Sequence, residues 1–180
     1  MKLLIASDLH GSARNCHLLL DAFAREGADR IVLLGDLLYH GPRNPLPEEY
    51  DTFAVTAMLN SMRDRLLCVR GNCDADVDQL VLQFPVLSDY ALLHVDGRNI
   101  YATHGHLCGP ENPPPMQPED ILLCGHIHLP VRRKLERGTY LNPGSLALPK
   151  EGTPKSYMTL AGGVFRWHEL ESGAEFQPLP

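Results

Sequence analysis

Side chains that can bind a metal ion follow five short apolar runs of the chain. They are Asp8 with His10, Asp36, Asn72, His104, and His126 with His128. Each apolar run has the length of a buried strand, and ligand sites in open sheets form beyond the carboxyl ends of the strands. An Asp after a strand is often only a capping residue, and a single HxH pair is as often a polar face as a ligand pair. Five such clusters at five strand ends, however, predict one common site.

The donor types in these clusters indicate which ions would bind. Carboxylate and imidazole ligands together suit Mn²⁺, Fe²⁺ or Zn²⁺, whereas Mg²⁺ and Ca²⁺ prefer oxygen ligands. Two carboxylates, one amide oxygen and four imidazoles are too many donors for one ion. They suit two ions that share a bridging carboxylate, as in two-metal hydrolases. We therefore predict two divalent metal ions, foremost Mn²⁺, with Zn²⁺, Fe²⁺ or Ni²⁺ as alternatives.

The periodicity of apolar residues predicts the elements that carry this site. Strands are expected at 2–6, 30–34, 66–69 and 121–124, with hairpins at 90–105 and 156–170. Helices are expected from Ser12 to about Glu26, at about 49–63, and as a short amphipathic helix within 74–84, while the proline-bearing segments 37–49 and 107–118 should be loops. The first half alternates strand and helix and the second is mostly strand, which favours layered sheets with flanking helices.

Composition narrows the class of protein. The 180 residues carry a formal net charge of −6, and we expect one domain over residues 1–180. The acidic balance argues against non-specific nucleic-acid binding, and no apolar run approaches the roughly 18 residues that a membrane span requires. The five cysteines are odd in number and form no CxxC pair, which is typical of reduced thiols in a cytoplasmic protein.

The order of the motifs DLH, GD, GN, H and GHIH resembles that of the calcineurin-like metallophosphoesterases, and SDLHGS, VRGNCD, THGH and NPGS extend the resemblance over nearly the whole chain. It implies an α/β fold, a two-sheet β-sandwich flanked by α-helices in four layers (αββα). It also implies a metal-dependent phosphodiesterase, in which a hydroxide that bridges the two metals is the nucleophile. The scaffold proteins of the same fold leave a non-catalytic or purely metal-binding role as the alternative, but the ligand set here is intact.

The resemblance also assigns roles to single residues. By motif, Asp8, His10 and His128 would hold the first metal ion, Asp36 would bridge both ions, and Asn72, His104 and His126 would hold the second. His17, His94 and His168 lie on predicted regular elements and are interpreted as structural.

Cys73 stands where larger family members have a His that protonates the leaving oxygen, and Ile127 stands where the family usually has Thr. A thiol is a poor general acid, and losing such an acid costs about 10²–10⁴ in rate when the leaving group needs a proton. Cys73 is therefore expected to favour substrates with good leaving groups. His40 is a candidate replacement acid, or else an ordinary loop histidine, and His106 is a candidate phosphate contact.

Charge counting points to the substrate class. Two divalent ions, two carboxylates and a hydroxide leave a charge of roughly +1, which a singly charged diester balances. A monoester would need further cations, for which Arg43 and Arg70 are candidates, while Arg14 is interpreted as a surface residue. The expected partner is therefore a small phosphodiester, with neither a membrane nor non-specific nucleic acid, and a homo-oligomer is compatible with the sequence.

Overall fold

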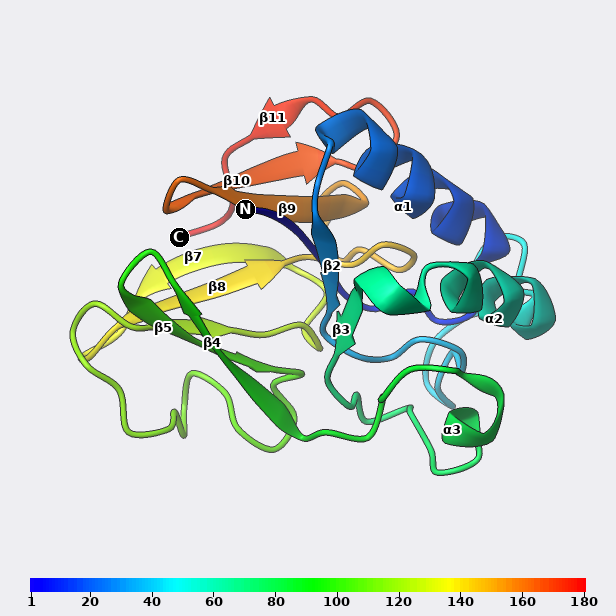
Figure 1. The fold of residues 1–180 in the computed structure, drawn as a ribbon, viewed down its shortest axis with the longest axis horizontal. Coiled ribbons are helices and arrows are strands. Elements are labelled where there is room, and N and C mark those ends of the chain that lie inside the picture. Colours follow the sequence, from blue (N-terminus) through cyan, green and yellow to red (C-terminus); the bar gives the residue numbers. More distant parts are fainter.

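The computed structural model describes residues 1–180 and consists of two mixed β-sheets packed face to face, with helices on one side (Figure 1). The first sheet has the strand order β11-β10-β9-β1-β2-β3 and the second β4-β5-β6-β8-β7. The strands are β1 Lys2–Ala6, β2 Arg30–Leu33, β3 Leu66–Cys68, β4 Tyr90–Val95, β5 Arg98–Thr103, β6 Ile121–Leu123, β7 Pro130–Lys134, β8 Thr139–Pro143, β9 Ser156–Ala161, β10 Val164–Glu169 and β11 Glu175–Phe176. The helices are α1 Ala13–Glu26, α2 Thr52–Ser61 and α3 Asp78–Val81, with a 3₁₀ turn at Arg63–Arg65.

The strands that lead into the predicted site are parallel to their neighbours. β1 pairs with β2 and β2 with β3 in the first sheet, and β5 pairs with β6 in the second, all in parallel register. The crossover from β1 to β2 runs through α1, which Ser12 caps by accepting a hydrogen bond from the Asn15 N–H and which Gly27 ends in a left-handed conformation. Because parallel strands point the same way, their carboxyl ends lie along one edge of each sheet.

Two apolar layers hold the sandwich together. Helices α1 and α2 lie on one face of the six-stranded sheet (Figure 1), and Leu19 and Leu59 of these helices share a buried cluster with Leu4 and Leu33 of the strands. The opposite face of that sheet packs against the inner face of the five-stranded sheet. The expected two-sheet sandwich is therefore confirmed.

The outer face of the five-stranded sheet carries no helix. Met116 of the irregular segment 107–118 packs there with Leu122 and Tyr140 of the sheet. This segment contains five prolines, whose missing N–H groups and fixed φ angles prevent a helix. The two outer layers of this chain therefore differ: α1 and α2 cover one side, and a packed loop takes the place of the second helical layer of the expected αββα order.

Two expectations about helices need correction, and some strands were not predicted. The helix predicted at 49–63 spans Thr52–Ser61 with Asp51 as its N-cap, and Phe53 on it is 89% exposed. The amphipathic helix predicted within 74–84 is only the single turn α3, because the Asp74 carboxylate binds backbone N–H groups of other loops. Strands β7, β8 and β11 were not predicted; in β7, the exposed residues Arg132–Lys134 break the apolar pattern. None of the helices is long and apolar enough to cross a membrane.

Candidate metal centre

The carboxyl ends of five strands from both sheets converge on one cluster of polar side chains. The residues that follow β1, β2 and β3 come from the first sheet, and those that follow β5 and β6 come from the second. Five of the seven predicted ligands are buried, while His126 is half-buried and Asn72 is exposed. The structure thus brings together Asp8, His10, Asp36, Asn72, His104, His126 and His128.

Asp8, His10 and His128 form the first half of the centre. Asp8 Oδ1 lies 3.2 Å from His128 Nε2 and 3.7 Å from His10 Nε2, and the two Nε2 atoms lie 3.3 Å apart. Each imidazole donates its Nδ1–H to a backbone carbonyl, of Tyr39 at 2.8 Å and of Leu148 at 2.6 Å. Because carbonyls only accept, the neutral rings carry their lone pairs on Nε2, and the two Nε2 atoms face each other. Asp8 Oδ1 is buried without a hydrogen-bond donor, so three acceptors converge in a way that fits a cation.

Asn72, His104 and His126 form the second half. His104 Nε2 lies 3.0 Å from Asn72 Oδ1 and 3.3 Å from His126 Nδ1. Its Nδ1–H is donated to the carbonyl of Leu34 at 2.6 Å, so His104 Nε2 faces the cluster and would present a lone pair there once a metal ion has displaced its proton. Oxygen and nitrogen acceptors again converge on one point, as they would around a second cation.

Asp36 lies between the two halves. Its Oδ2 atom is 3.6 Å from His10 Nε2 in the first half and 3.5 Å from His104 Nε2 in the second. Its other oxygen, Oδ1, accepts a hydrogen bond of 2.8 Å from the backbone N–H of Cys73. This bond fixes the carboxylate with Oδ2 directed at both halves, which is the placement that a bridging ligand requires.

The electrostatics of the cluster reflect its burial and its mixed charges. Burial alone would raise the pKa of Asp8, but the imidazoles of His128 and His104 outweigh it and hold that pKa below its usual value. Burial lowers the pKa of His104, but the carboxylates of Asp36 and Asp8 outweigh burial and raise this pKa to about 9. Burial and the neighbouring His104 lower the pKa of His126. In the protein without metal, His104 is thus the group on which a proton is held most tightly, and a metal ion would displace that proton.

The backbone of the ligand loops is strained where the ligands sit. Asp8, His10, Asp36, His126 and His128 all have φ between 48° and 70°, in the left-handed region that costs a non-glycine residue of order 1–3 kcal/mol. Strain of this kind persists only where the surrounding fold enforces it, and here it directs five side chains inward. The strained turns therefore serve to position the ligand side chains of the centre.

Close backbone approach completes this geometry at two glycines. A Cβ atom at Gly71 would collide with the Asp36 carboxylate, and one at Gly125 would collide with Ser7 Oγ. Both loops can therefore approach the ligands only with glycine at these positions.

Asp74 was missed as a functional residue, although it lies two residues after Asn72. Its carboxylate is 4% exposed and accepts three backbone hydrogen bonds, from Asp36 N at 2.8 Å, Leu37 N at 2.8 Å and Gly71 N at 2.7 Å. Burial raises the pKa of Asp74 in spite of these bonds. Asp74 therefore ties the loop of Asp36 to the loop of Asn72, and its position directly after the GNC motif is the only sequence signal for this role.

Asn142 and Ser145 of the NPGS motif hold the remaining ligand loops. Asn142 Nδ2 donates to the carbonyl of Gly125 at 2.7 Å, and Ser145 Oγ donates to the carbonyl of Asp8 at 2.9 Å. Both residues are fully buried. Sequence reasoning matched this motif by resemblance only, because the hydrogen bonds join segments that are 17 and 137 residues apart.

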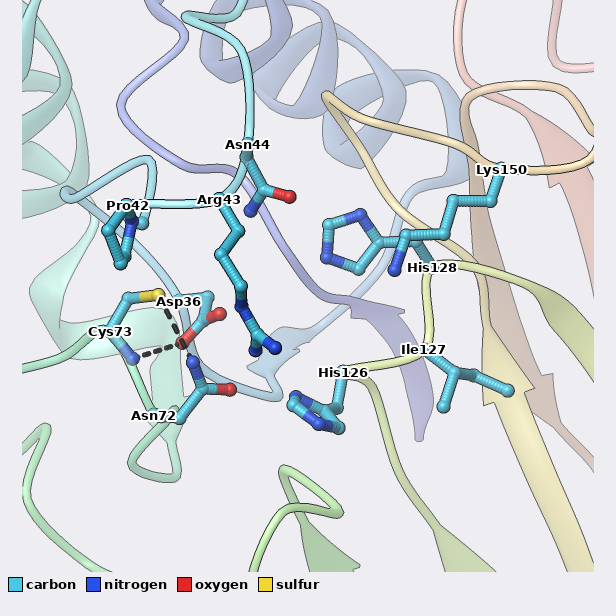
Figure 2. Close-up of a pocket in the computed structure, with 11 residues that line it drawn as sticks. Asp36, Pro42, Arg43, Asn44, Asn72, Cys73, His126, Ile127, His128 and Lys150 are labelled. Atoms are coloured by element: carbon cyan, nitrogen blue, oxygen red, sulfur yellow. Dashed lines mark hydrogen bonds between the residues drawn. The ribbon is translucent and has the colours of Figure 1, made fainter.

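A cavity of about 450 Å³ opens over the centre and carries two cationic side chains (Figure 2). Arg43 extends into it between Asn72 and His126, and Lys150 reaches over His128 (Figure 2). Arg43 was a sequence candidate, whereas Lys150 lies in an irregular segment without any pattern. The cavity is thus suited to an anionic group above the ligands.

Cys73 lines the same cavity. Its Sγ atom lies within 4.8 Å of the ligand atoms of both His10 and Asp36, and Asn72 Nδ2 donates to it over 3.2 Å. Burial and the neighbouring Asp36 carboxylate raise the pKa of this thiol to about 12. Ile127 lies between the ligands His126 and His128 in the sequence, and its side chain points away from the centre (Figure 2).

Of the other two catalytic candidates, His106 lies beside a ligand and His40 does not line the cavity. The His106 ring lies 5.3 Å from the His104 ring between centroids, and its buried Nδ1 has no hydrogen-bond partner. The His40 ring packs edge-on against Tyr39 and Tyr50 and does not line the cavity, a placement that fits an ordinary loop histidine better than a replacement acid.

The two remaining arginine candidates lie outside the cavity over the centre. Arg14 pairs with Glu48 and Glu171 on the surface. Arg70 donates to the carbonyl of Asp74 and lines a neighbouring pocket with His106.

Comparison with known proteins identifies relatives over nearly the whole chain. Residues 1–162 match the profile of the calcineurin-like phosphoesterase superfamily domain. The chain is 44% identical over 164 residues to the phosphodiesterase YfcE of Escherichia coli K12, which covers 91% of this chain and 89% of YfcE. The solved structure of the E. coli phosphoesterase YfcE superposes with a TM-score of 0.95 at 41% identity, covering 99% of this chain and 98% of that one.

More distant structures share the fold alone. An archaeal phosphodiesterase matches with a TM-score of 0.66 at 19% identity, over 93% of this chain and 98% of its own. Vacuolar protein sorting 29 from Cryptosporidium parvum matches with 0.61 at 18% identity, over 97% and 94%. The profile match and the 44% identity confirm the predicted family and the predicted class of enzyme, a phosphoester hydrolase. The chain therefore belongs to the calcineurin-like phosphoesterase superfamily.

Proposed function

We propose that this protein is a phosphodiesterase whose centre binds two divalent metal ions, foremost Mn²⁺. The observation that carries the proposal is the position of Asp36 Oδ2, at 3.6 Å from His10 Nε2 and 3.5 Å from His104 Nε2. With Asp36 shared, Asp8, His10 and His128 would hold one ion, and Asn72, His104 and His126 the other. Two such ions, when bound, supply Lewis acidity toward the phosphoryl oxygens and a water nucleophile at neutral pH.

The residues of the chain would bind and orient the phosphodiester. Arg43 and Lys150 project into the cavity above the ligands, where they would attract the phosphate anion. His106, beside His104, would contact the phosphate or hold the ligand ring in place. Cys73 is assigned no role as a nucleophile, because burial and the Asp36 carboxylate raise the pKa of its thiol to about 12 in the metal-free protein. The side chains of the protein would thus contribute by positioning the substrate rather than by covalent catalysis.

The preference for a diester is supported by charge and by the relatives. A singly charged diester matches the charge of about +1 left by two dications, two carboxylates and an activated water. The E. coli relative at 44% identity bears the name phosphodiesterase. Because Cys73 replaces an imidazole acid, esters that leave as stabilised anions should react best.

The test compares hydrolysis of bis(p-nitrophenyl) phosphate with that of p-nitrophenyl phosphate by metal-stripped protein reloaded with Mn²⁺. We expect metal-dependent turnover that favours the diester and is lost in Asp36→Asn. Asp120→Asn is the matched control, since Asp120 is buried and accepts a backbone hydrogen bond from Gln117 away from the centre. A preference for the monoester would contradict the assignment of substrate class, and absence of turnover with metal bound would favour a non-catalytic role.

A further inference from the structure

An apolar groove of about 570 Å³ lies beside the metal centre. Its walls come from the end of the Asp36 loop, from α2 and from the region around α3. The side chains that form them are mainly apolar or aromatic: Tyr39, Tyr50, Phe53, Ala57, Val77 and Val81. Packing of the hydrophobic core does not account for these apolar side chains, because they line a groove that is open to solvent.

The groove exposes apolar side chains to an unusual degree. Phe53 is 89% exposed, Val77 62% and Val81 48%. Single exposed apolar residues are ordinary, but a contiguous apolar patch on a soluble domain marks a binding surface. Its acidic member, Asp78, already accepts a hydrogen bond from the Ala75 N–H at 2.8 Å. The groove thus offers mainly apolar contact and little to recognise a charge.

The groove is continuous with the metal centre through Cys73. This residue lines both the cavity over the ligands and the groove, and its backbone N–H holds Asp36 Oδ1 at 2.8 Å. Tyr39 connects the two as well, because its carbonyl accepts the Nδ1–H of His10 while its side chain lines the groove. A group attached to a phosphate at the centre could therefore enter the groove past Cys73.

The opposite side of the centre is polar. Arg43, Asn44 and Lys150 line the cavity over the ligands, and none of them lines the groove. A phosphodiester carries two ester groups that diverge from phosphorus, so the two sides of this site would meet different groups. The asymmetry of the walls indicates an asymmetric substrate.

We propose that the groove is the subsite for an aromatic or similarly flat apolar ester group of the phosphodiester substrate. This inference rests on the proposed function, since it places one substituent of that substrate. Phe53, Val77 and Val81 are specificity-determining residues, and their contacts favour an aryl group over a small alkyl group at the same phosphate.

The kinetic test uses two diesters with the same leaving group, phenyl p-nitrophenyl phosphate and methyl p-nitrophenyl phosphate. We expect kcat/KM to favour the phenyl ester by about tenfold or more, as apolar pockets do for groups that fill them. In Phe53→Ser with Val77→Ser, both at exposed positions, this ratio should fall about tenfold. Leu92→Ser is the control, because Leu92 is 53% exposed on β4 and lines neither cavity. A ratio that is the same in all three proteins overturns the inference and leaves the proposed function standing.

A binding measurement decides the matter independently of turnover. Diphenylphosphinate and dimethylphosphinate are anions of similar charge that carry no ester bond, and each is titrated into ¹⁵N-labelled protein with Zn²⁺. We expect amide shifts at Ala57 and Val81 with the diphenyl compound alone. Shifts confined to the ligand loops, or equal with both compounds, overturn the proposal. If the double variant instead converts an oligomer to a monomer in sedimentation and keeps the phenyl preference, the groove is an interface between copies and the proposal fails.

Discussion

Replacing Asp74 by Asn should weaken both the fold and its hold on metal, although Asp74 is not expected to touch a metal ion. Oδ2 accepts the N–H groups of Asp36 and Gly71, and Oδ1 accepts that of Leu37. The amide of Asn can accept at one atom only, so its NH₂ group would face a backbone N–H as a second donor. One of the three buried hydrogen bonds is then lost, and the other two are made to a neutral amide oxygen instead of a carboxylate.

The magnitude follows from these three bonds. A hydrogen bond to a charged group contributes about 1.5–3 kcal/mol, and an unpaired buried N–H costs about 1–3 kcal/mol. Burial of the carboxylate, which raises the pKa of Asp74, offsets part of this loss. We expect the free energy of unfolding to fall by about 2–3 kcal/mol and Tm by roughly 5–10 °C for a chain of this length. Because Asp74 orients two ligand loops, metal affinity should fall about 10- to 100-fold.

The assay combines urea denaturation of the metal-free protein with Mn²⁺ titration of the folded protein. Asp120→Asn loses a buried carboxylate that accepts one backbone bond elsewhere, so it should lower stability less and leave metal affinity unchanged. If the unfolding free energy of Asp74→Asn lay within about 0.5 kcal/mol of wild type, the contacts of Asp74 would not stabilise the two loops. Equal losses of metal affinity in Asp74→Asn and Asp120→Asn would show that Asp74 does not orient the ligands.

Two further outcomes are expected. Cys73→His places an imidazole where Cys73 now lines the cavity. It should raise kcat/KM for diphenyl phosphate, measured by phenol release, by about 10²-fold relative to kcat/KM for bis(p-nitrophenyl) phosphate. An unchanged ratio of the two kcat/KM values would show that no acid is missing. In the metal-free protein, Tm should fall as pH rises from about 6.5 to 9 in differential scanning fluorimetry, because the pKa of His104 is raised to about 9 and its contribution, up to roughly 3 kcal/mol, is lost through that interval. A Tm that stays level or rises over this interval would contradict the assignment of the proton to His104.

The sequence predicted the elements that bear the ligands. β1, β2, β3, β5 and β6 all lie where apolar runs end in polar clusters, because a buried strand is an uninterrupted apolar segment. The hairpin turns Asp96-Gly97 and Gly162-Gly163 both show the positive φ values that such pairs favour. Local pattern and local turn chemistry were sufficient for these features.

Features that depend on contacts between distant segments could not be read in the same way. Asp74 binds N–H groups up to 38 residues away, and an acidic residue in a loop is more often exposed. The exposed Phe53 has the apolar spacing of a core residue, since periodicity does not distinguish a core from an open groove. Asp and His adopt the left-handed conformation more often than most residues do, but residue type alone does not show which of them adopt it, because the tertiary fold enforces it.

Metal stoichiometry decides whether this centre binds two ions. Metal-free protein is titrated with Mn²⁺ while bound metal is counted and electron paramagnetic resonance spectra are recorded. We expect two Mn²⁺ per chain with a spin-coupled spectrum, and loss of the coupled spectrum in Asp36→Asn, because Asp36 Oδ2 lies between both halves of the centre. One Mn²⁺ per chain with the uncoupled six-line spectrum would show that the centre holds a single ion and that Asp36 bridges nothing.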